Sequence, residues 1–147
     1  MKKLFDTPPV SQGVDTAILF IRIAVAALML THGIPKFQSL MADGETQFPA
    51  VLGMSATLSL TLTVFAEVFC SMLILFGLGT RLAVLPLLFT MLVAVLYIHA
   101  GEPFGKKELG LLYILPYTTL LLTGSGKYSI DYLLQHRLAP KPAFQRS

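Results

Sequence analysis

Histidine, lysine and glutamate side chains interrupt two strongly apolar stretches of this chain. His32 and Lys36 stand one helical turn apart in the first stretch, and Glu67 lies within the second. Ionisable groups at membrane depth are costly and normally face a protein interior or a wet cavity. A carboxylate and an imidazole can act as bases, while a lysine ammonium donates hydrogen bonds. We therefore take Glu67 and His32 as candidate catalytic residues and Lys36 as a candidate ligand-binding residue.

Arg22 is a further ionisable residue of the first apolar stretch. At ~100° per residue, Arg22, Met29 and Lys36 fall on one broad face of a helix. A buried guanidinium and a buried carboxylate compensate each other when they are hydrogen-bonded. The sequence thus predicts a pair between Arg22 and Glu67, either as a structural ion pair or as part of a ligand site. A third interpretation is that Arg22 reaches the membrane interface.

Four more residues are candidate ligand-binding positions in the later apolar stretches: Tyr97, His99, Glu108 and Tyr113. A quinone would suit a pocket built from such residues, because its carbonyls need hydrogen-bond donors and its quinol must lose protons to a base. Tyr113 and Tyr117, one turn apart, would line a ring-shaped ligand or serve as packing. His32 and His99 could also be two axial haem ligands, but two histidines without metal-ligand spacing do not favour a haem.

The composition indicates an integral membrane protein. Of 147 residues, 54% are hydrophobic and 13% are charged, against about 25% charged in soluble domains. The mean hydropathy is +0.71. The net charge of +3 does not indicate a nucleic-acid partner, because the basic residues stand at the ends of the apolar stretches and in the tails. Cys70 is the one cysteine, which excludes an internal disulfide and a cysteine zinc site.

We predict an all-α membrane protein, an antiparallel bundle of four transmembrane helices over residues 16–123. Residues 1–15 and 124–147 are predicted to be cytoplasmic, and the end of the tail is expected to be mobile. Asp15 or Thr16 is expected to cap the first helix. Each span needs ~20 residues, and the apolar stretches place the spans at about 16–37, 55–78, 82–99 and 108–123.

The orientation follows from the distribution of lysine and arginine, which are enriched on the cytoplasmic side of a membrane. Both termini are therefore predicted to be cytoplasmic. Asp6, Pro8 and Pro9 interrupt the region after the basic start, so no cleaved signal peptide is expected. The side with both termini carries Lys2, Lys3, Arg81, Lys127, Arg137, Lys141 and Arg146, and the other side carries Lys36, Lys106 and Lys107.

Three stretches in combination resemble the DoxX family of small bacterial membrane proteins. They are HGIPK at 32–36, AEVFCSMLILFGLGTRLA at 66–83 and KELGLLYILPYTTLLLTGSGKYSID at 107–131. Ser125 departs from the family pattern, which often has proline there. The resemblance implies a four-helix bundle in the bacterial cytoplasmic (inner) membrane. It also implies an association with oxidoreductases, because some members accompany quinone-linked sulfur or respiratory enzymes and others accompany oxidative-stress complexes.

The favoured function is a small membrane subunit that binds a quinone or a similar lipid-soluble redox molecule and supports an oxidoreductase partner. The chain has no metal or flavin motif of its own, so the sequence leaves open whether it is an enzyme. The alternative is a non-enzymatic protein, either a small-molecule transporter or a membrane assembly or stability factor. A transporter of four spans would be narrow and would require a homo-oligomer. In each case the lipid bilayer is a partner.

Overall fold

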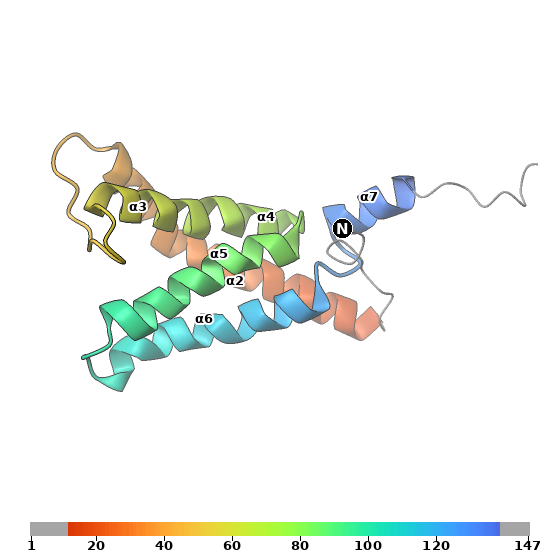
Figure 1. Cartoon of the computed structure of the whole chain (residues 1–147). Coiled ribbons are helices and arrows are strands. Elements are labelled where there is room, and N and C mark those ends of the chain that lie inside the picture. The colour runs from red at the N-terminus through yellow and green to blue at the C-terminus, as the bar shows by residue number, and fades with distance from the viewer. Residues whose placement is uncertain (1–11, 139–147) are drawn as a thin grey trace, which may run out of the picture.

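The computed structural model describes residues 12–138, and all regular secondary structure in that part of the chain is helical (Figure 1). Two of the segments, labelled η, are π-helical turns. The expectations for residues 1–11 and for the proline-rich end at 139–147 lie outside the described residues. The elements are α2 (Gln12–Met41), α3 (Ala56–Val64), η1 (Phe65–Cys70), α4 (Ser71–Phe76), α5 (Thr80–Val93), η2 (Ala94–Ile98), α6 (Phe104–Thr123) and α7 (Ile130–Leu138).

Three helices are long and apolar enough to cross a membrane. They are Gln12–Met41, Ala56–Phe76 and Thr80–Ile98, which correspond to the first three predicted spans. The predicted fourth span lies in α6, but Lys106, Lys107 and Glu108 occupy the start of that helix. The uncharged part, residues 109–123, is shorter than the ~20 residues of a typical crossing. The structure therefore confirms an all-helical membrane protein with three candidate spans, and it does not confirm the four-span bundle.

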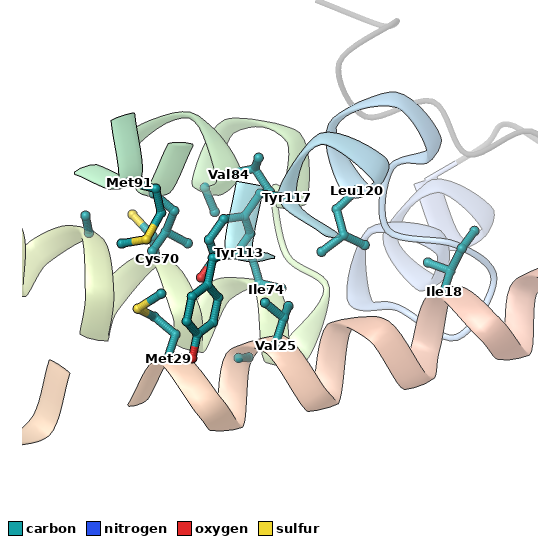
Figure 2. Packing of buried hydrophobic residues seen from close by; sticks show 14 residues of the cluster. Ile18, Val25, Met29, Cys70, Ile74, Val84, Met91, Tyr113, Tyr117 and Leu120 are labelled. Carbon is teal, nitrogen blue, oxygen red and sulfur yellow. The ribbon is translucent and has the colours of Figure 1, made fainter. Parts of the chain in front are cut away.

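The helices are apolar on the outside as well as in the core, which is expected when the solvent is hydrocarbon. Phe20 and Leu122 are each 73% exposed, and Leu96 is 69% exposed. The core lies where α2, α4, α5 and α6 face one another, and Tyr113 and Tyr117 are at its centre (Figure 2). A bilayer would cover the exposed apolar surface, so the lipid-facing residues need no protein partner.

The first helix is longer than the sequence predicts. It begins at Gln12 and continues through Pro35 to Met41, whereas the predicted span was 16–37. Hydroxyl groups near the proline donate to the backbone, from Ser39 to the Pro35 carbonyl and from Thr31 to the Leu28 carbonyl. The cap predicted at Asp15 or Thr16 is wrong, because both residues lie inside the helix.

Arg22 ties the ends of several elements together at the end of the bundle that lies next to α7 (Figure 1). Its side chain is buried and donates to four backbone carbonyls. Nε donates to Ile74 and Nη2 to Leu75, each at 3.0 Å, at the end of α4. Nη1 donates to Ser125 at 2.6 Å and to Tyr128 at 2.9 Å. The carbonyl end of a helix carries partial negative charge, so a guanidinium is stabilised there. The predicted pair between Arg22 and Glu67 is wrong.

Gly77 and Asp131 also stabilise this end of the bundle. Gly77 has φ 68°, and an added Cβ would lie 2.7 Å from the Arg22 Cζ atom, so the turn after α4 requires glycine. Both carboxylate oxygens of Asp131 accept from the Gly79 backbone N–H, at 2.9 and 3.0 Å. Asp15 likewise accepts from the Lys127 backbone N–H at 3.0 Å. The segment after α6 is therefore fastened to the ends of α2 and α4.

Replacing Arg22 by lysine should destabilise the bundle. A lysine ammonium cannot reach four carbonyls in these directions, and each lost bond to a charged donor costs ~1.5–3 kcal/mol. We expect the free energy of unfolding to fall by about 3 kcal/mol or more. Thermal unfolding in detergent, followed by circular dichroism, measures the effect. Arg137→Lys, at an exposed position of α7, is the matched control, and equal midpoints for the two variants would contradict the proposed bonding role.

Candidate functional site

Lys36 and Glu67 form an ion pair between α2 and η1. The Lys36 Nζ atom donates to both carboxylate oxygens of Glu67, at 2.5 and 2.7 Å. The Glu67 side chain is 3% exposed and that of Lys36 is 32% exposed, so the pair extends from the bundle interior towards its surface. Removing one partner of a buried pair leaves an uncompensated charge, at a cost of ~3–5 kcal/mol. Lys36 is therefore the partner that makes a carboxylate possible at position 67.

Gly33 lets α2 approach η1 closely enough for this pair to form. A Cβ added at Gly33 would lie 2.8 Å from the Val68 Cγ2 atom and 3.0 Å from the Glu67 carbonyl carbon. No side chain at position 33 could therefore be accommodated without moving η1. Lys36 follows Gly33 by one turn on the same helix, so the close approach brings its ammonium to the carboxylate.

Both π-helical turns contribute to the wall of one cavity. Glu67 comes from η1 and Val95 from η2. The second turn also meets a glycine, since a Cβ at Gly110 would lie 2.6 Å from the Val95 Cγ2 atom. π-helical turns are rare in proteins and occur frequently at functional sites. Here they present residues of two adjacent helices to the same space.

The cavity has a volume of about 150 Å³. A cavity of roughly this size accommodates one benzene-sized ring. Its wall mixes charged, aromatic and apolar groups from α2, η1, the end of α5, η2 and α6. The lining residues are Met29, His32, Lys36, Glu67, Met91, Ala94, Val95, His99, Lys106, Leu109, Gly110 and Tyr113.

Aromatic contacts hold one side of the cavity. The His32 ring meets Tyr113 edge to face, with centroids 6.0 Å apart and planes at 87°. Tyr113 in turn stacks on Tyr117 at a centroid distance of 6.0 Å and an angle of 20°. Figure 2 shows these two tyrosines at the centre of the packed core, with Tyr113 beside Met29. The imidazole is thus supported by a buried aromatic pair, at the point where α2 and α6 meet.

Five of the eight predicted site residues line this cavity: His32, Lys36, Glu67, His99 and Tyr113. Arg22 does not line it, because its guanidinium is occupied by carbonyls at the α7 end of the bundle. Tyr97 is 55% exposed and lies between Val95 and His99 in sequence, so it points away from the wall these two form. Glu108 is exposed and also lies outside the wall, because the face of α6 towards the cavity carries Lys106, Gly110 and Tyr113.

The sequence interpretation missed Lys106 and the two methionines, Met29 and Met91. Lys106 could have been found from its spacing, since it lies seven residues before Tyr113 and so on the same face of a helix. Met29 is on the helical face shared with Lys36. Met91 gave no signal, because a methionine in an apolar span is ordinarily core packing.

The cavity can serve hydrogen bonding and proton transfer. The Lys36 ammonium can donate to a ligand carbonyl while it remains beside the Glu67 carboxylate. Glu67, His32 and His99 are groups in the wall that can accept a proton. His99 lies at 3.3 Å from Glu102, measured between Nδ1 and a carboxylate oxygen. Within residues 12–138, no three His, Cys, Asp or Glu side chains are grouped so as to hold a metal ion.

Substituting alanine for Gly33 should disturb the ion pair. The added methyl group forces η1 away from α2, and overpacking of this kind costs ~1–3 kcal/mol. We expect a lower thermal midpoint and faster reaction of Lys36 with an amine-directed reagent, read by peptide mass spectrometry. Gly13→Ala is the matched control on the same helix, because an added Cβ meets nothing within 4 Å there. Unchanged Lys36 reactivity in a folded Gly33→Ala protein would refute this positioning role.

Comparison with known proteins places the chain among small membrane proteins. Residues 17–100 match the DoxX family profile. The chain is 27% identical over 118 residues to a Bacillus subtilis (strain 168) protein named "Putative oxidoreductase CatD", with 80% of this chain and 86% of that protein covered. It is 30% identical over 137 residues to an uncharacterized membrane protein of Mycobacterium tuberculosis, at 82% and 83% coverage. No solved structure gives a significant match.

Proposed function

The chain belongs to the DoxX family, and from this premise we propose that it is a small integral membrane subunit that binds a quinone or a similar lipid-soluble redox molecule and supports an oxidoreductase partner. The observation that carries the proposal is the Lys36–Glu67 ion pair in the wall of a ring-sized cavity. Buried ionisable groups within a membrane are costly and are typical of ligand or proton pathways. A ligand that needs both a donor and a base accounts for the pair.

The chemistry of a quinone uses each polar group of the cavity. Reduction of a quinone places one proton on each carbonyl oxygen, and oxidation of the quinol releases these protons. Lys36 would hold a carbonyl oxygen by donating to it, while Glu67 and His32 would pass protons towards His99 and Lys106 at the outer end. The electrons would come from or go to a partner protein, because the cavity residues do not carry them. The name of the Bacillus relative is consistent with such a partnership.

The same proposal includes α6 as a fourth crossing and a bacterial inner-membrane location with cytoplasmic termini. Lys106 and Lys107 at the start of α6 would lie at the outer interface, as Lys36 does near the end of α2. Arg81, Lys127 and Arg137 would lie on the cytoplasmic side, in agreement with the usual charge bias. The packing of α6 against α5 and α2 supports this placement, because it holds the short apolar part of α6 within the bundle.

Cysteine labelling tests the fourth crossing. In a Cys70→Ala background, Glu102→Cys should react with a membrane-impermeant maleimide added to intact cells. Lys127→Cys should react only after the membrane is permeabilised, because α6 would carry the chain back to the cytoplasmic side. Labelling of position 127 in intact cells would contradict the crossing. Glu45→Cys, in the loop after α2, serves as a second outer marker.

The quinone proposal is tested by mass spectrometry of small molecules extracted from purified protein. We expect a quinone to be enriched at least ~10-fold in the native protein relative to a Glu67→Gln, His32→Ala double variant, since each change removes a polar contact worth ~1.4 kcal/mol or more. An unrelated four-span protein in the same detergent gives the background. Equal background in all three samples would reject quinone binding and favour a transport or assembly role.

A further inference from the structure

A second hollow runs between α2 and α6, and it is almost wholly apolar. It has a volume of about 390 Å³, more than twice that of the polar cavity. We call it the α2/α6 groove. Its lining residues are Phe20, Ile21, Ala24, Val25, Leu28, His32, Leu109, Leu112, Tyr113 and Pro116.

The α2/α6 groove adjoins the polar cavity. His32, Leu109 and Tyr113 line both hollows, so the contact between the His32 and Tyr113 rings marks the boundary between them. On α2 the groove extends from Phe20 to His32, which corresponds to about 18 Å of helix at 1.5 Å per residue. This length is roughly the depth of one leaflet, half of the ~30 Å hydrocarbon core.

The two hollows differ in size, and each suits a different part of one ligand. The polar cavity, at about 150 Å³, is smaller than the ~300–1,000 Å³ of ordinary ligand pockets. It holds a ring but no long substituent. No Lys, Arg, Asp or Glu lines the groove, and its polar side chains are those of His32 and Tyr113 at the boundary, so it suits an apolar chain. Together they match a molecule with a polar ring and a long hydrocarbon tail.

We propose that the α2/α6 groove holds the apolar tail of the same molecule whose ring occupies the cavity, and that this ligand enters sideways from the bilayer between α2 and α6. The inference rests on the proposed function and specifies the ligand class as a long-tailed amphiphile. Ala24 is the residue that keeps the groove open, because it is the smallest side chain in the wall. The outer end of the cavity, with His99 and Lys106, then stays free for proton exchange.

A second apolar groove provides an internal comparison. It lies between the α3–η1 segment and α5, has a volume of about 350 Å³ and is lined by residues such as Leu62, Phe65 and Phe89. Its size and apolar character are similar to those of the α2/α6 groove. It shares no lining residue with the polar cavity. A tail attached to a ring in the cavity should therefore lie in the first groove and not in the second, although both are exposed to lipid.

Photo-crosslinking in vesicles of phosphatidylcholine tests this placement. Two benzoquinones with the same decyl chain would be used, one carrying a diazirine on the ring and the other at the end of the chain. We expect the ring probe to label peptides with residues of the cavity, and the tail probe to label residues 20–28 of α2 and 112–116 of α6. An excess of unlabelled decyl benzoquinone should suppress both patterns.

Variants distinguish binding of the tail in the α2/α6 groove from general contact of the tail with lipid-facing residues. Ala24→Phe should lower the yield of tail labelling at residues 112–116 by on the order of tenfold, because the added ring fills the groove. Ala27→Phe is the matched control at an exposed alanine of the same helix that does not line the groove, and it should leave the pattern unchanged. Leu112→Trp fills the groove from α6 and serves if the first variant does not fold.

The outcomes distinguish the two proposals. In one outcome, the ring probe labels the cavity and unlabelled quinone suppresses this labelling, but the tail probe labels the groove between the α3–η1 segment and α5, or all lipid-facing residues alike. This outcome would overturn the tail placement and leave the proposed function intact. The tail placement would also be overturned if the Ala24→Phe and Ala27→Phe proteins gave equal tail labelling at α6. If unlabelled decyl benzoquinone suppressed no labelling by either probe, the proposed function itself would be overturned.

Discussion

The buried guanidinium of Arg22 is the interaction on which the α7 end of this protein depends. It donates to carbonyls at the end of α4 and in the segment after α6, where the helices leave carbonyls short of intrahelical donors. In hydrocarbon, a carbonyl left without any donor would cost several kcal/mol. One cation thus satisfies four acceptors from two separate parts of the chain. The conformation of Gly77 and the bonds of Asp131 arrange the backbone around it.

The charges of Glu67 and Lys36 have a different arrangement from that of Arg22, and we expect them to bind a ligand. Glu67 is paired with Lys36, but this pair borders an open cavity, and its lysine remains 32% exposed. Arg22 is 1% exposed and is bonded to backbone carbonyls. The bundle therefore separates a buried charge bonded to backbone at one end from an ion pair that borders a cavity.

The geometry of the cavity depends on small residues and irregular turns more than on its polar residues. Gly33 lets α2 touch η1, and Gly110 lets α6 touch η2. The π-helical turns change the angular positions of the residues that follow them, so that Glu67 and Val95 face the same space. With regular helices and alanine at these two positions, the same polar side chains would be held farther apart. The same packing of helices also forms the α2/α6 groove beside the cavity.

The sequence by itself determined the apolar helices, the membrane environment and the group of residues that includes His32, Lys36, Glu67, His99 and Tyr113. These follow from composition, from helical periodicity and from the cost of charge in hydrocarbon, which are all properties of one segment at a time. In the sequence, Arg22 is the predicted partner of Glu67 and Lys36 is a predicted ligand-binding residue.

Only the tertiary structure decided which partner each charge has. Arg22 and Lys36 lie on one face of α2, about 21 Å apart along its axis at 1.5 Å per residue, and either could face Glu67 until the register of α2 against α3, η1 and α4 is known. That register is set by the contact of Gly33 with η1 and by the carbonyls around Arg22. The exclusion of Tyr97 and Glu108 from the cavity likewise depends on helix rotation. Periodicity defines a face of each helix, but the packing of all the helices decides what that face meets.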